Sequence, residues 1–126
     1  MISRFKSTGT LRFFHDPKLI VEVDPEITHF ARALVPKAVR LNRQKYAPHI
    51  TVVRCEPLVG AERWDGVPLE FEYETYVRND DTYHWLRVFS DELIRIRLEL
   101  GLPALSWGCR GPDHFDSFHT TIGNQK

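Results

Sequence analysis

Two short segments of the chain, residues 49–52 (His-Ile-Thr-Val) and 119–122 (His-Thr-Thr-Ile), repeat one pattern of histidine, any residue, threonine and aliphatic residue. In a β-strand, residues i and i+2 point to the same face. Each segment therefore places an imidazole and a hydroxyl side by side. The residues that face the other way form an apolar set: Ile50, Val52, Phe118 and Ile122. The repeat predicts two strands that each pack one face into a core and present a histidine and a threonine on the other.

Two such strands together carry the groups for acid–base displacement at phosphorus. A neutral imidazole can take a proton from the nucleophile, and an imidazolium can give a proton to the leaving oxygen, because histidine changes charge near working pH. The threonine hydroxyls can hold the non-bridging phosphate oxygens. We therefore expect His49, Thr51, His119 and Thr121 to form a catalytic site that needs no metal ion and no other cofactor.

These motifs resemble those of the 2H phosphoesterase superfamily, which is named for its two His-x-Thr/Ser motifs. The resemblance implies an α+β fold with antiparallel or mixed sheets, flanking helices, and two lobes that carry one motif each on either side of a central cleft. It also implies that His49 and His119 act as general acid and general base, in an order that the sequence leaves open. Thr120 departs from the family pattern, which usually has an aliphatic residue at this core-facing position.

Among family members, the motif spacing and residues 118–124 look most like phage anti-CBASS nucleases, which destroy cyclic nucleotide messengers. The resemblance then implies that the chain cleaves the 3′-5′ phosphodiester bonds of a cyclic di- or trinucleotide. The ribose 2′-hydroxyl would attack the adjacent phosphate. The biological role would be viral evasion of host immune signalling. Two alternatives stay open. One is a 2′,3′-cyclic phosphodiesterase for RNA or tRNA ends or 2′-5′ oligoadenylates, and the other is a non-catalytic module that sequesters a nucleotide.

Hydrophobic periodicity and capping residues predict one domain, residues 1–126, with strands and helices in mixed order. Asp24-Pro25-Glu26 is typical of a helix start, and Ser90 is typical of an N-cap. Gly101 and Pro103 are expected to stop the second helix. The predicted elements are strands at 10–14, 18–23, 49–55, 69–77 and 82–89, helices from Asp24 to near Pro36 and from Ser90 to Leu100, a hairpin turn at 79–81, and a final motif strand.

Alternation in two of these strands predicts which other side chains share the catalytic face. Leu86 and Val88 form the aliphatic face of one strand, and Leu11 and Phe13 form that of another. The opposite faces then carry aromatic rings that can stack on a base and arginines that can bind phosphate. The expected substrate-binding residues are Arg12, Phe14, Tyr83, Trp85 and Arg87. Glu70, Glu72 and Glu74 would repel a phosphate and are expected on a solvated face.

A second cluster contains residues that zinc could use: Cys109, Asp113, His114, Asp116 and His119. Their spacing matches no standard structural zinc pattern. We therefore expect a polar loop beside the active site and no metal site.

Composition indicates which cellular compartment and which class of ligand suit this chain. The chain has 17 Lys+Arg and 17 Asp+Glu, so its formal net charge is zero. This balance counts against avid binding of long nucleic acid and suits a small nucleotide. No apolar run is long enough for a membrane span, and the first residues have no signal-peptide core. Two scattered cysteines, Cys55 and Cys109, favour a reducing cytoplasm, the host's if the protein is viral. The sequence leaves the oligomeric state open.

Overall fold

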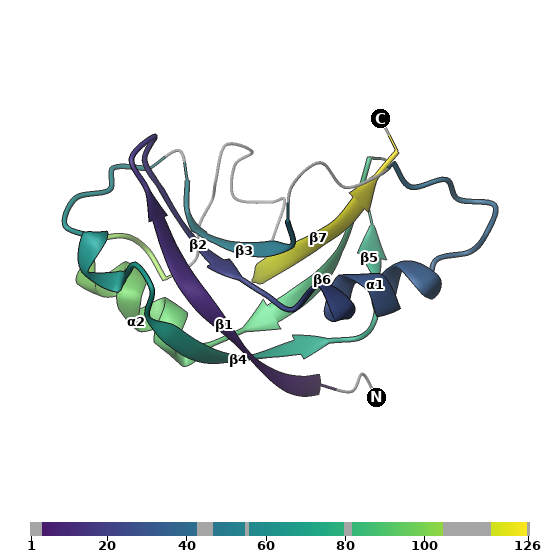
Figure 1. Cartoon of the computed structure of the whole chain (residues 1–126), viewed down its shortest axis with the longest axis horizontal. Helices are drawn as coiled ribbons and strands as arrows, with labels where there is room; N and C mark the ends of the chain where they lie inside the picture. Colours follow the sequence, from purple (N-terminus) through teal and green to yellow (C-terminus); the bar gives the residue numbers. More distant parts are fainter. Residues whose placement is uncertain (1–3, 43–46, 55, 80–81, 105–116, 126) are drawn as a thin grey trace.

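The structure is a computed structural model that describes residues 4–42, 47–54, 56–79, 82–104 and 117–125. The described residues form strands β1 (Arg4–Phe14), β2 (Lys18–Glu22), β3 (His49–Val53), β4 (Pro68–Glu74), β5 (Arg78–Asn79), β6 (Tyr83–Phe89) and β7 (Phe118–Asn124). The helices are α1 (Pro25–Ala33), α2 (Asp91–Glu99) and a short 3₁₀ helix, η1 (Glu62–Trp64). All strand pairings are antiparallel (Figure 1).

Six of these strands close into a barrel in the order β4-β1-β2-β3-β7-β6, because β4 also pairs with β6. The short β5 extends the sheet beyond β6. The paired residues can be followed from strand to strand around the barrel, starting at Arg4 of β1. One full circuit returns to β1 at Arg12, so the sheet closes with a shift of eight residues along β1, from 4 to 12. Closing a sheet requires such a stagger, because the strands must tilt against the barrel axis.

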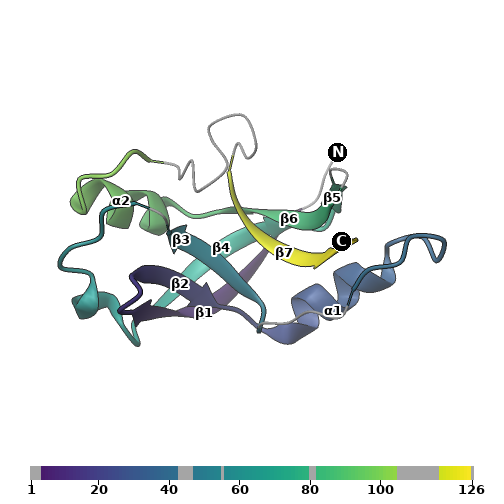
Figure 2. The same ribbon diagram turned by 90° about the horizontal axis from the view of Figure 1, so that it is seen from above.

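Aliphatic side chains fill the barrel interior, and the two helices cover its ends. The main buried cluster joins the strands to Leu93 and Ile96 of α2. A second cluster joins Ala31 of α1 to Leu86 and Ile122. Figures 1 and 2 show α1 and α2 at opposite ends of the sheet. The polar faces of the strands therefore point outward from the barrel wall.

Local sequence signals set both helix starts and the end of α2 as predicted, whereas α1 ends at Ala33, before the predicted end near Pro36. The Asp24 carboxylate accepts a hydrogen bond from the Glu26 amide at 2.9 Å, and Pro25 is the first helical residue. The Ser90 hydroxyl accepts one from the Leu93 amide at 3.3 Å. Gly101 has a φ of 77°, the left-handed conformation in which glycine ends a helix.

The α+β class and the antiparallel sheets are confirmed, but β1 begins earlier than predicted. The residues before Thr10 lack an apolar alternation, so the sequence gives little sign of a strand there. In the structure, Arg4 and Lys6 pair with Glu74 and Glu72 of β4. Gly9 lets β1 approach β2, because a Cβ at this position would lie 2.5 Å from Val21 Cγ1.

Candidate functional site

The strands that carry the two motifs, β3 and β7, are neighbours in the barrel wall (Figures 1 and 2). Their antiparallel register pairs Ile50 with Thr120, the middle residues of the two motifs. Continuing this register by one residue in each direction places His49 opposite Thr121 and Thr51 opposite His119. The two histidines are then diagonal neighbours, about 7–8 Å apart in regular geometry and somewhat closer between their Cβ atoms. Each motif histidine therefore lies opposite the threonine of the other motif in this register.

Burial confirms the alternation predicted for both motif strands. Ile50, Val52 and Ile122 are fully buried, and Thr120 is 1% exposed. The other four motif side chains, those of His49, Thr51, His119 and Thr121, are half-buried on the outer face of the wall, where a ligand can reach them. Thr120 faces the core as expected, and among the described residues its buried Oγ1 has no hydrogen-bond partner.

A backbone carbonyl orients the first motif histidine. His49 Nδ1 lies 3.0 Å from the Ala47 carbonyl oxygen. Because a carbonyl only accepts, Nδ1 carries a proton in this contact. Nε2 of the neutral ring then keeps its lone pair and can accept a proton, and Nε2 of the charged ring can donate one.

Each motif strand is also held by an arginine from one helix. Arg97 of α2 donates from Nη1 to the Val52 carbonyl at 2.7 Å, and Arg32 of α1 donates from Nη1 to the Ile122 carbonyl at 2.6 Å. Val52 and Ile122 are the fourth residues of their motifs, so the two contacts occupy equivalent positions. Gly123 leaves room for the second contact, because a Cβ there would lie 2.7 Å from Arg32 Nη1.

Arg97 is fully buried, and its charge is balanced within the structure. Its Nη1 and Nη2 donate to the Glu56 carboxylate at 2.9 and 2.8 Å, and its Nε donates to the Pro103 carbonyl at 2.8 Å. Neither Arg97 nor Arg32 was predicted from the sequence as a site residue. The only available signal was an arginine within the helical pattern, which is usually solvent-exposed.

Strand β6 adds two of the five predicted substrate-binding residues directly beside the second motif. Arg87 pairs with His119, and Trp85 pairs with Thr121. Tyr83 lies further along the same strand, where it pairs with Asn124. All three side chains are half-buried while Leu86 and Val88 are in the core, as the alternation predicted.

The structure places the other two predicted substrate-binding residues further away, because β2 separates β1 from β3. Arg12 donates from Nε to Glu22 Oε1 at 2.6 Å, and this contact raises the pKa of the guanidinium. Glu22 pairs with His49, so Arg12 balances a carboxylate next to the first motif. Phe14 is exposed, and Lys18 Nζ lies 4.9 Å from the centre of its ring.

The prediction that Glu74 lies on a solvated face is wrong. Glu70 is exposed and Glu72 half-buried, but Glu74 is only 5% exposed. Strand β4 approaches β6 here to close the barrel, and Glu74 Oε1 lies 3.6 Å from Arg87 Nε and 3.7 Å from Arg78 Nη2. Alternation within one strand could not reveal this contact, since it depends on the strand that comes to lie beside it.

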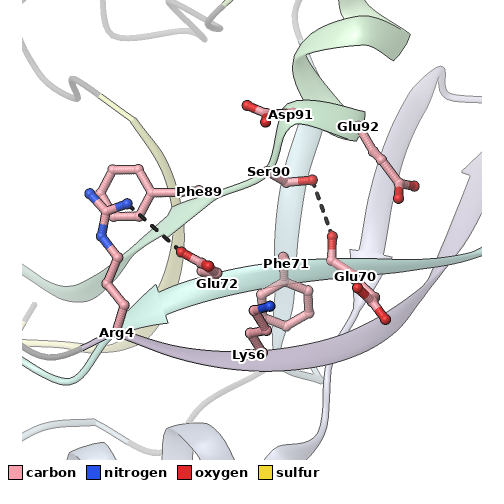
Figure 3. Close-up of a pocket in the computed structure, with 9 residues that line it drawn as sticks. All are labelled: Arg4, Lys6, Glu70, Phe71, Glu72, Phe89, Ser90, Asp91 and Glu92. Carbon is pink, nitrogen blue, oxygen red and sulfur yellow. Dashed lines mark hydrogen bonds and ion pairs between the residues drawn. The ribbon is translucent and has the colours of Figure 1, made fainter.

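A surface pocket of about 350 Å³ lies further along the outer face of β4 and β6, at the start of α2 (Figure 3). None of the motif residues lines it. The Arg4 guanidinium stacks 3.7 Å from the centre of the Phe89 ring and forms an ion pair with Glu72 at 3.9 Å (Figure 3). The lining mixes both charges: Arg4, Lys6, Glu70, Phe71, Glu72, Phe89, Ser90, Asp91 and Glu92.

Four of the five residues considered as zinc ligands, Cys109, Asp113, His114 and Asp116, lie outside the described residues, as does Cys55. Among the residues that are described, no group of three or more His, Cys, Asp and Glu side chains could hold a metal ion. Within the same part of the chain, no helix has the length and apolar character needed to span a membrane.

Comparisons of the chain with protein-family models, with curated proteins and with solved structures gave no match.

Proposed function

We propose that this protein is a metal-independent phosphodiesterase of the 2H type that cleaves a small nucleotide substrate. One observation carries the proposal: the register of β3 and β7, which pairs Ile50 with Thr120 and so brings both His-x-Thr motifs onto one outward face. Two imidazoles and two hydroxyls on one half-buried surface are the minimum set for acid–base chemistry at phosphorus without a metal.

In the proposed reaction, one of His49 and His119 takes a proton from the ribose 2′-hydroxyl, whose oxygen attacks the adjacent phosphorus. The other, as imidazolium, gives a proton to the 5′-oxygen as its bond to phosphorus breaks. Thr51 and Thr121 donate hydrogen bonds to the non-bridging oxygens. The 2′,3′-cyclic phosphate that forms is then opened by water, with the two histidines in exchanged roles. The Nδ1 contact of His49 leaves Nε2 as its proton-transfer atom.

The likeness to 2H phosphoesterases, with two lobes and a cleft, is part of this proposal. In it, β1–β3 belong to one lobe and β6–β7 to the other, with the motif strands at the seam. Two observations support this division. The strands β3 and β7 share a single paired position, Ile50 with Thr120. By contrast, the pairing of β1 with β2 covers the whole of β2, and that of β6 with β7 covers most of both strands. Separate helices also hold the two motif strands, through Arg97 and Arg32.

For the substrate, we propose a cyclic di- or trinucleotide of the kind used in immune signalling, degraded in the cytoplasm of an infected host. The ring of Trp85 beside the second motif and the ring of Tyr83 further along β6 support a ligand with more than one base, since an aromatic ring stacks on any base. A balanced net charge supports a small ligand over long RNA.

The test is a product screen with excess substrate and EDTA, across 2′-5′ and 3′-5′ linear oligonucleotides, cyclic di- and trinucleotides, and RNA with a 2′,3′-cyclic end. The proposal expects many turnovers per chain on at least one cyclic oligonucleotide. Much faster turnover of RNA with a 2′,3′-cyclic end would instead show an RNA-end phosphodiesterase. Retention of at most one ligand per chain, without product, would show a sequestering module.

A further inference from the structure

An exposed ion pair lies next to the first motif on the outer face of the barrel. Arg12 Nε of β1 donates a hydrogen bond to Glu22 Oε1 of β2 at 2.6 Å, and the two side chains are 44% and 48% exposed. Glu22 pairs with His49 in the register of β2 and β3, so the two side chains share one face of the wall. Neighbouring strands lie about 4.8 Å apart. A ligand with its phosphate at the histidines can therefore reach the ion pair with its base.

The ion pair keeps donors and an acceptor available for a ligand. Within the part of the chain that the structure describes, the hydrogen bond engages only Nε of Arg12 and Oε1 of Glu22. Both Nη groups of Arg12 and Oε2 of Glu22 remain. Gly66, where a Cβ would lie 3.9 Å from Arg12 Nη1, brings no side chain that could cover this nitrogen. The pair therefore presents N–H donors directly beside a carboxylate acceptor.

The charges at this position favour an uncharged group over a second phosphate. Arg12 and Glu22 neutralise each other, and the nearby Asp65 carboxylate also acts on the Arg12 guanidinium. A phosphate here would face two carboxylates and a single guanidinium, and like charges repel. A nucleobase carries no net charge and presents donors and acceptors along its edge. The pair is therefore suited to bind the edge of a base.

Guanine has the order of groups that matches this pair. Its N7 and O6 are adjacent acceptors, and N1–H and the N2 amino group beyond them are adjacent donors. The two Nη groups of Arg12 can donate to N7 and O6, which is the commonest specific contact that arginine makes with a base. The Glu22 carboxylate can accept from N1–H and the N2 amino group. Adenine, cytosine and uracil lack a pair of adjacent acceptors followed by a pair of adjacent donors.

We infer that Arg12 and Glu22 form a guanine-binding subsite, hereafter the guanine subsite. This inference rests on the proposed function and narrows its substrate class. The guanine subsite lies on the β3 side of the motifs, whereas Trp85 pairs with Thr121 on the β7 side. A substrate with its scissile phosphate at the motifs places guanine at the subsite and the neighbouring base on Trp85. The substrate is therefore an oligonucleotide with guanine next to the cleaved bond.

A purely structural role for the same ion pair is to join β1 to β2. Exposed ion pairs usually contribute little to stability. That role predicts that changes at Arg12 or Glu22 alter the unfolding temperature slightly and leave the base preference as it is. The guanine subsite predicts a loss of preference that depends on which group of the base is removed. Base analogues that lack a single group separate the two accounts.

The experiment measures KM for three cyclic dinucleotides that contain only guanosine, only inosine or only 7-deazaguanosine. Inosine lacks the N2 amino group, and 7-deazaguanosine lacks the N7 acceptor. Wild type is expected to have a KM about tenfold lower for guanosine than for either analogue, the scale of a lost base contact. Glu22→Gln should lose the preference over inosine, and Arg12→Met the preference over 7-deazaguanosine. The control variants Arg63→Met and Glu99→Gln change another exposed ion pair, of 3.4 Å, and should keep both preferences.

Calorimetric titration with nucleoside 3′-monophosphates separates the subsite from the proposed function, because it needs no turnover. Wild type should bind guanosine 3′-monophosphate more tightly than the inosine and adenosine forms, and Glu22→Gln should bind all three alike. If no nucleotide is cleaved but this pattern holds, the proposed function fails and the guanine subsite stands. If cyclic dinucleotides are cleaved but Glu22→Gln keeps the wild-type preference, the subsite is wrong and the proposed function stands. Tightest binding of the adenosine form would also overturn the guanine subsite.

Discussion

Arg97 Nη1 donates a hydrogen bond of 2.7 Å to the carbonyl oxygen of Val52, the residue that follows Thr51 in the first motif. Arg32 makes the corresponding contact with Ile122, the residue that follows Thr121. A hydrogen bond to the backbone at this point fixes the strand without using the side chain of the preceding threonine. The fold thus positions both motifs by the same means from opposite ends of the barrel.

Arg97→Met should destabilise the protein by about 3 kcal/mol, because it removes the charged hydrogen bonds that the buried guanidinium donates to the partly buried Glu56 carboxylate and to the Val52 carbonyl. Urea unfolding followed by circular dichroism measures the change. The control is Arg95→Met on the same helix, where the side chain is 69% exposed and its ion pair with Glu99 is 4.0 Å long. A difference of less than about 0.5 kcal/mol between the two variants, the scale of an ordinary surface substitution, would contradict the role given to Arg97.

His49→Ala and His119→Ala should each lower kcat by roughly 10²–10⁴-fold, the usual loss on removing a general acid or base. The double variant should be hardly slower than the slower single variant, because residues that act as a unit are not additive. Steady-state rates on the best substrate from the product screen measure both effects. His29→Ala, at an exposed position on α1, is the matched control. A folded His49 or His119 variant with near wild-type activity would rule out the paired mechanism.

The rate should be unaffected by EDTA and should follow a bell-shaped dependence on pH. One imidazole must be neutral and the other charged, so the active form is lost on both sides of an optimum. A pH series of kcat, with and without chelator, tests both statements. Activity that disappears with EDTA and returns with Zn²⁺ would instead favour a metal site that includes Cys109 and His114.

Trp85→Ala should raise KM about tenfold or more, the scale of one lost base–aromatic stack of ~1–3 kcal/mol. The pH profile should not move, since the ring transfers no proton. Phe14→Ala should have a much smaller effect, because Trp85 pairs with Thr121 whereas β2 separates Phe14 from the first motif. Equal effects of the two substitutions would argue against the arrangement of the binding face given above.

Thr120→Val should raise the free energy of unfolding by about 1 kcal/mol, because the Thr120 hydroxyl is buried without a hydrogen bond among the described residues. Activity should be kept, since this side chain faces the core. Thr28→Val is the control: Thr28 is 2% exposed, but its hydroxyl donates to the Pro25 carbonyl at 3.0 Å, so its loss should destabilise. Thermal unfolding of both variants decides the point, and a destabilised Thr120→Val would mean that its hydroxyl has a partner.

The sequence by itself determined the features that depend on neighbours along the chain. The alternation in residues 49–52 and 118–122 predicted which side chains enter the core, because side chains in a strand alternate between its faces. Asp24, Pro25, Ser90 and Gly101 marked the helix ends through local hydrogen bonds and backbone preferences.

Only the tertiary structure decided what depends on contacts between distant strands and helices. The pairing of Ile50 with Thr120 brings the two motifs together, and closure of β4 onto β6 buries Glu74 between Arg78 and Arg87. The contacts of Arg97 with Val52 and Glu56 join residues more than 40 positions apart. Periodicity within one strand says which face a residue occupies, but the residue that faces it is set by the register with the next strand, and that register is fixed when the whole barrel packs.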